Sequence, residues 1–162
     1  MEYLGNKEIL KNYKIGFLCS RKVPANIILK TYDWAIAKRD KGVCIISGFH
    51  SKIEKDVFHF LLKGVQPLIL VLARGLKQIW EPEIKVALGQ KRLLVISPFP
   101  SEVKRVTSHT SVIRNKKIIE LADELFIACV SKGGQIEKLN DLYKNKLNNT
   151  NELFNFNLKI IP

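Results

Sequence analysis

Residues 42–62 read G-V-C-I-I-S-G-F-H-S-K-I-E-K-D-V-F-H-F-L-L, and this stretch decides the fold. Its four apolar residues at 43–46 predict a buried strand, and Ser47-Gly48 predicts a tight turn directly after it. A helix is expected to follow, because Ser51 and Glu54 have the spacing of a capping box. A strand, a small-residue turn and a helix in this order are typical of parallel α/β sheets, which bind anions at such turns.

The rest of the chain repeats this alternation of apolar strands and amphipathic helices. The sequence predicts strands at 14–19, 43–46, 67–72, 92–96 and 125–130. It predicts helices at 25–38, 52–63, 79–89, 111–122 and 134–146. Continuous apolar strands separated by helices indicate a parallel sheet that is covered on both faces. The predicted fold class is therefore α/β, a three-layer Rossmann-like fold with a mostly parallel sheet.

A single domain is expected over residues 1–146, because a chain of 162 residues fits one domain and contains no internal repeat. Residues 147–162 form an Asn-rich C-terminal tail. Within that tail, the alternating pattern of residues 154–161 predicts an edge strand.

The charge balance indicates an acidic partner. Lys and Arg total 27 against 15 Asp and Glu, which gives a formal net charge of +12. Nucleic acid is the commonest partner of such a basic domain, and a solvated basic surface is the other interpretation.

Compartment is inferred from the N-terminus and the cysteines. Residues 1–14 are polar and charged, so no signal peptide is expected, and no apolar run reaches the ~20 residues of a membrane span. Cys19, Cys44 and Cys129 lack the spacing of a disulfide framework or a zinc site. We expect them to be buried thiols in a cytoplasmic protein.

Three short motifs lie at predicted strand ends or helix starts. Cys19-Ser20-Arg21 follows the first predicted strand, Ser47-Gly48 opens S-G-F-H-S-K-I-E after the second, and Arg114-Asn115 opens R-N-K-K-I-I before the last. In this order they resemble the G-S-R, S-G-x-A-x-G-I-D and R-N-R-I-I motifs of the DNA-processing protein A family (DprA, also called Smf). The resemblance covers roughly residues 14–134 and implies a Rossmann-like domain, reduced and divergent because the family's usual extra domains are absent.

The chain departs from the family pattern at several positions. The family's A-x-G becomes His50-Ser51-Lys52, so one glycine of the turn is lost. The family's helix histidine falls at Phe58, and His59 is rotated away from that position by about 100°. The chain is also similar to the wider LOG-type group of Rossmann-like nucleotide-binding proteins, but of that group's P-G-G-x-G-T-x-x-E only Gly133-Gly134 remains, with a displaced glutamate.

Candidate phosphate-binding residues lie at the predicted carboxyl edge of the sheet. They are Ser20, Arg21, Lys22, Ser47, Gly48, His50, Ser51, Lys52, Arg114, Asn115, Gly133 and Gly134. Arg and Lys would supply charge, while hydroxyl and backbone N–H groups would fix register. Structural roles are the alternatives: a helix cap for Ser51, turn geometry for Gly48, and an ion pair with a helix carboxylate for Arg114.

No Ser-His-Asp set, metal cluster or Walker sequence is present, so we expect no catalytic residue, metal or cofactor. The leading hypothesis is a non-enzymatic protein that binds single-stranded DNA or a nucleotide. The resemblance implies a role in DNA uptake, processing or recombination, with a recombinase partner and a homodimer. The alternative is a small-nucleotide sensor or a LOG-like nucleotide phosphoribohydrolase.

Overall fold

A computed structural model of the chain describes residues 1–147, so the predicted tail strand at 154–161 lies outside the described residues. Within residues 1–147, no helix combines the length and apolar character needed to cross a bilayer. The elements in chain order are β1 (Glu2–Gly5), η1 (Lys7–Lys11), β2 (Lys14–Cys19), α1 (Ala25–Asp40), β3 (Cys44–Ser47), α2 (Lys52–Leu62), β4 (Leu68–Val71), α3 (Pro82–Gly89), β5 (Leu93–Ser97), α4 (Ser108–Leu121), β6 (Glu124–Cys129), α5 (Gln135–Lys138), α6 (Asn140–Tyr143) and η2 (Lys144–Lys146).

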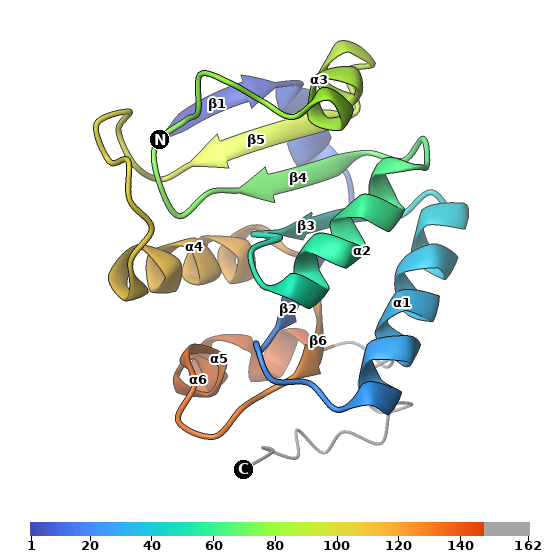
Figure 1. Ribbon diagram of the computed structural model, residues 1–162, viewed down its shortest axis with the longest axis vertical. Coiled ribbons are helices and arrows are strands. Elements are labelled where there is room, and N and C mark those ends of the chain that lie inside the picture. Colours follow the sequence, from blue (N-terminus) through green and yellow to red (C-terminus); the bar gives the residue numbers. More distant parts are fainter. Residues whose placement is uncertain (148–162) are drawn as a thin grey trace.

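The strands form one six-stranded sheet in the order β1-β5-β4-β3-β2-β6. Every neighbouring pair is parallel except β1 and β5, which run antiparallel. Helices α1, α2 and α3 cover one face of the sheet, and α4, α5 and α6 cover the other (Figure 1). The predicted three-layer α/β fold with a mostly parallel sheet is therefore confirmed.

The order of the strands creates a switch point. From β2 the chain adds β3, β4 and β5 successively in one direction, and α4 then returns it across the sheet to place β6 on the other side of β2. The connections after β2 and after β6 consequently diverge at the carboxyl ends of these two strands. Ligands of open α/β sheets bind at such a point.

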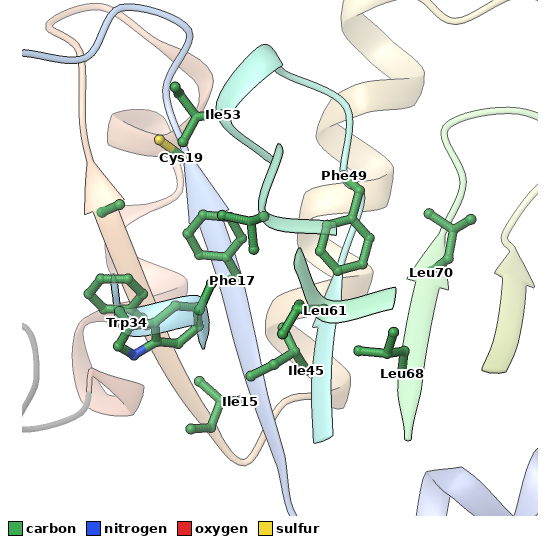
Figure 2. Packing of buried hydrophobic residues seen from close by; sticks show 14 of the residues in the cluster. Ile15, Phe17, Cys19, Trp34, Ile45, Phe49, Ile53, Leu61, Leu68 and Leu70 are labelled. Carbon is green, nitrogen blue, oxygen red and sulfur yellow. The ribbon is translucent and has the colours of Figure 1, made fainter. Parts of the chain in front are cut away.

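Aromatic side chains pack the first face of the sheet near β2 and β6. The ring centroids of Trp34 and Phe126 lie 4.2 Å apart, and those of Phe17 and Trp34 lie 5.4 Å apart. Figure 2 shows Phe17 and Trp34 beside Ile15, with Ile45 on the adjacent strand. These buried side chains hold α1 against strands β2 and β6.

Strand β1 was not predicted, although it completes one edge of the sheet. Its four residues are polar or half-buried, and no periodic pattern distinguishes them from a loop. Pairing with β5 supplies its hydrogen bonds, and Asn6 then ends it by donating from Nδ2 to the Lys91 carbonyl at 2.9 Å. This segment is therefore a strand because it pairs with β5, whose residues lie 89 to 95 positions further along the chain.

Two helix starts differ from the predicted ones, because a proline sets one and a capping box sets the other. Helix α3 begins at Pro82 rather than at residue 79, since the residue before a proline is held extended. Helix α4 begins at Ser108 rather than at residue 111, because Thr107 and Thr110 form a capping box.

The helix predicted at 134–146 is wrong as a continuous element. Near Leu139 the chain tightens, and the Leu139 N–H donates to the Ile136 carbonyl at 3.1 Å, one residue short of an α-helical bond. Ile136, Leu139 and Tyr143 pack into the core of the second face on either side of this break.

An ion pair between a buried lysine and a partly exposed aspartate ties the start of β2 to the start of β6. Lys14 is 6% exposed, and its Nζ donates to Asp123 Oδ2 at 3.0 Å and to the Asn12 carbonyl at 2.8 Å. The same Oδ2 accepts from the Lys14 backbone N–H at 2.8 Å. Burial raises the pKa of Asp123, but the bonds and charge of Lys14 outweigh it and hold that pKa below its usual range.

Asp123→Asn should therefore destabilise the protein at pH 7 by about 1 kcal/mol, a value below that of a fully buried charged bond because the carboxylate is 41% exposed. A lowered folded-state pKa contributes stability above the unfolded value of about 3.9, and this contribution is lost as pH falls through the folded pKa. Urea denaturation at pH 7 and pH 3 should show the difference between variant and wild type shrinking in acid. Asp40→Asn, at a 61% exposed carboxylate, is the control and should change little. A difference that persists undiminished at pH 3 would contradict the assignment.

Candidate nucleic-acid interface

A cavity of about 640 Å³ opens at the switch point of the sheet, and we refer to it as the switch-point cavity. Ser20 follows β2, Ser131 follows β6, His50 lies in the turn after β3, and Arg114 reaches in from α4. The Ser131 N–H donates to Ser20 Oγ at 2.9 Å, which joins the two strand ends. The sequence-predicted residues that line this cavity are Ser20, Arg21, Lys22, His50, Ser51, Arg114, Asn115 and Gly134.

The structure places the other four predicted residues outside this lining. Ser47 is fully buried, and its Oγ accepts from the Phe49 N–H at 3.3 Å. Lys52 is exposed on α2 and lies 3.5 Å from Asp56. Gly133 has a φ of 73°, a left-handed conformation that suits glycine. Gly48 packs beneath Arg114, on the boundary of a neighbouring cavity.

Several lining residues were not predicted. The polar ones on and around α4 and α5 are Thr107, Ser108, Ser111, Ser131, Lys132 and Gln135, and the others are Cys19, Glu54, Val106 and Ile136. The hydroxyl-rich run T-S-H-T-S at 107–111 was a usable signal, because such residues cap helices and bind phosphate. It was missed because the helix start was placed at residue 111.

The carboxylate of Glu54 occupies the N-terminus of α2. Glu54 is 4% exposed, and its oxygens accept from the N–H groups of Cys19 at 3.2 Å and His50 at 2.8 Å. A third bond, from the Ser51 N–H at 3.2 Å, completes the capping box together with the Ser51 hydroxyl. These backbone donors, which the sequence suggested for a bound phosphate, therefore already have a protein acceptor.

The other two helix starts at the cavity also bind their own side chains. At α4, Thr107 Oγ1 accepts from the Thr110 N–H at 3.1 Å, and Thr110 Oγ1 accepts from the Thr107 N–H at 2.9 Å. Before α5, the Gly133 N–H donates to the Glu137 carboxylate. Several backbone donors at this sheet edge therefore already have side-chain acceptors, and the positive charge for an anion would come from the lining side chains.

Arg114 supplies the innermost charge of the cavity. It is 6% exposed, and its Nε and Nη2 donate to Asn115 Oδ1 at 3.1 and 3.0 Å rather than to a helix carboxylate. Burial lowers the pKa of Arg114, the Glu54 charge raises it, and Arg21 lowers it further. An arginine so perturbed remains a cation at neutral pH.

Gly48 allows Arg114 to take this position. A Cβ atom at Gly48 would come within 2.6 Å of Arg114 Cδ and Nε. The φ of Gly48 is not in the left-handed region; Phe49, the next residue, has that conformation with a φ of 44°. Close packing under the guanidinium, rather than turn geometry, is thus what requires glycine.

The rim of the cavity is basic. Arg21, Lys22 and Lys132 are exposed, and with Arg114 they give four cations around the single lining carboxylate of Glu54. Such a concentration of positive charge attracts phosphate groups.

The shifted pKa values of His50 and Cys19 do not suit a general acid or a nucleophile. Burial, then Arg114, Lys55 and Arg21 in that order, lower the pKa of His50, so its ring is neutral at pH 7. Burial followed by the Glu54 charge raises the pKa of Cys19, so its thiol stays protonated and is a poor nucleophile. Within residues 1–147, no group of three or more His, Cys, Asp or Glu could hold a metal ion.

These features define a Rossmann-like α/β protein with a basic, hydroxyl-lined cavity at the switch point of its sheet. The chain belongs to the DNA recombination-mediator protein A family, whose family model matches residues 1–140. The resemblance inferred from the three motifs is therefore confirmed. A search of curated proteins returned no match.

Two solved structures of DNA processing protein A are similar to this chain. The Helicobacter pylori protein is 18% identical with a TM-score of 0.70, and the match covers 97% of this chain and 82% of that one. The Streptococcus pneumoniae protein is 18% identical with a TM-score of 0.68, and the match covers 98% of this chain and 62% of that one. At this identity the likeness establishes the shared fold.

Gly48→Ala should lower the free energy of unfolding by about 1–3 kcal/mol, because the added methyl group overpacks the Arg114 side chain. Gly89→Ala is the matched control: a Cβ there meets no atom within 4 Å, so this change should be neutral or slightly stabilising. Chemical denaturation of both variants measures the effect. Equal stabilities for the two variants would show that Arg114 does not depend on the glycine.

Ser51→Ala should cost about 1 kcal/mol through loss of the helix cap at α2. Ser101→Ala, in an exposed turn where the hydroxyl contacts only the neighbouring Glu102 side chain, should leave stability within about 0.5 kcal/mol of wild type. Thermal denaturation compares the two. A larger loss at Ser101 would contradict the capping role.

Proposed function

We propose that the chain binds single-stranded DNA in the switch-point cavity and acts without enzymatic activity in DNA processing and recombination. The four-cation lining of that cavity carries the proposal. Family membership supports it, as does the fold shared with the Helicobacter pylori protein, which is described as binding single-stranded DNA.

The contacts of the cavity favour DNA over a small nucleotide. Arg21, Lys22 and Lys132 are exposed at its rim, where they suit a chain of phosphates that continues past the cavity. Hydroxyl groups and side-chain cations position a backbone without reading sequence, so binding would be tolerant of base identity. The predicted contacts of Ser20, Ser51, Asn115 and Gly134 are part of this proposal.

Two carboxylates, Glu54 in the cavity lining and Glu137 just outside it, favour binding over hydrolysis. Glu54 is held by three backbone donors. Glu137 accepts from the Gly133 N–H. A phosphoribohydrolase would need a carboxylate aimed at the substrate, and both of these are directed to the protein backbone instead.

The cellular setting follows from the same assignment. A recombinase is the proposed protein partner, because the family is described as a mediator of recombination. A homodimer is proposed because two linked cavities on one strand would raise affinity through effective concentration. The three cysteines are free and buried, which suits a reducing cytoplasm.

A salt titration of Arg21→Ala tests the function. Fluorescence anisotropy with a labelled oligothymidylate should show wild-type affinity falling steeply as salt rises, because bound phosphates release counterions. Loss of the Arg21 phosphate contact should weaken binding more than about tenfold and reduce the salt slope by about one.

Lys41→Ala is the matched control, because it removes one exposed charge at the opposite end of the sheet, in the turn before β3. It should lower affinity by less than about twofold. Absence of wild-type binding even at low salt would refute the DNA assignment, and equal losses for both variants would refute a role for Arg21 in particular.

A further inference from the structure

A second cavity, of about 410 Å³, lies between α2 and α3, and we refer to it as the α2–α3 cavity. It shares three lining residues with the switch-point cavity: His50, Val106 and Arg114. A linear ligand that extends past Arg114 would therefore leave the first cavity and enter the second.

The inner wall of the α2–α3 cavity is apolar and aromatic. Phe49 stacks on Phe58 of α2 with ring centroids 4.2 Å apart, and Leu70 and Leu72 form the sheet side of the cavity. Figure 2 shows Phe49 and Leu70 on adjacent segments of this face. A wall of this kind suits the flat face of a nucleobase, because stacking on aromatic groups tolerates every base.

The lining of the α2–α3 cavity carries an excess of basic side chains. The basic lining residues are Lys55, Arg74, Lys77 and Arg114. The two acidic ones are engaged: Glu81 accepts from Lys77 at 3.3 Å, and Glu83 lies 3.5 Å from His59 Nδ1. Arg74 Nε is buried with no hydrogen-bond partner among the described residues. A buried donor of this kind is unfavourable unless an acceptor reaches it.

We propose that the α2–α3 cavity is a second nucleotide subsite, which takes the base and sugar of the nucleotide adjoining the one in the switch-point cavity. The inference rests on the proposed function. Arg114 lines both cavities, so it is placed to meet the phosphodiester that links the two nucleotides. A single strand of at least two nucleotides, rather than a free mononucleotide, is the ligand that fills both.

Phe58→Ala tests the subsite through the dependence of affinity on strand length. Calorimetric titration with thymidine monophosphate and with a tetrathymidylate should show tetranucleotide affinity falling about tenfold, because one stacked base is lost. Mononucleotide affinity should stay within about twofold, since Phe58 does not line the switch-point cavity. Phe60→Ala is the matched control: Phe60 lies on the same helix, packs on Tyr32 at 5.1 Å and lines neither cavity.

A second pair of variants tests the subsite independently in case Phe58→Ala does not fold. Lys55→Glu reverses a charge at the rim of the α2–α3 cavity, and Lys85→Glu makes the same change on the exposed side of α3. The ratio of tetranucleotide to mononucleotide affinity should fall for Lys55→Glu alone. An unchanged ratio in Phe58→Ala or Lys55→Glu would overturn the subsite and leave the proposed function standing. Failure of the wild-type chain to bind any oligonucleotide would overturn both.

Discussion

The buried carboxylate of Glu54 is the interaction on which the rest of the site depends. It accepts N–H groups from Cys19 at the end of β2 and from His50 and Ser51 in the turn after β3. A buried carboxylate is strongly unfavourable unless it is hydrogen-bonded, so these three donors stabilise it. The carboxylate in turn fixes the end of β2 against the start of α2. Cys19, His50 and Ser51, which line the cavity, are therefore held in place by the protein itself.

This arrangement changes how the cavity can recognise an anion. The sheet edge offers three helix starts, which would ordinarily present free amides to phosphate. Here side chains cap two of them, Ser51 and Glu54 at α2 and Thr107 at α4, and Glu137 accepts from Gly133 just ahead of α5. Side chains supply the positive charge for recognition: Arg114 is fixed by close packing, while Arg21, Lys22 and Lys132 lie exposed at the rim. Binding by cations of this kind is sensitive to salt and indifferent to sequence.

The sequence predicted the parts of the fold that local patterns control. Strand β4 was found because its residues form a continuous apolar run, and helix α2 because apolar residues recur at a helical period. The observed starts of α3 and α4 differ from the predicted ones because Pro82 and Thr107, rather than the apolar pattern, determine where each helix begins. The break near Leu139 was missed because Ile136, Leu139 and Tyr143 have the spacing of one face of a continuous helix, so the apolar pattern gives no sign of it. Strand β1 has no local signal and exists through β5.

The sequence by itself determined the alternation of strands and helices and the capping box at Ser51, because each rests on residues a few positions apart. It also indicated the family, through three short motifs that occur in the expected order along the chain. Only the tertiary structure decided where the site lies. Return of the chain through α4 brings Ser131 to within hydrogen-bonding distance of Ser20, at a sequence separation of 111. Strand pairing over such separations depends on the packing of the whole sheet. The physical reason is that sequence patterns report local geometry, whereas a cavity arises from elements that fold together from distant parts of the chain.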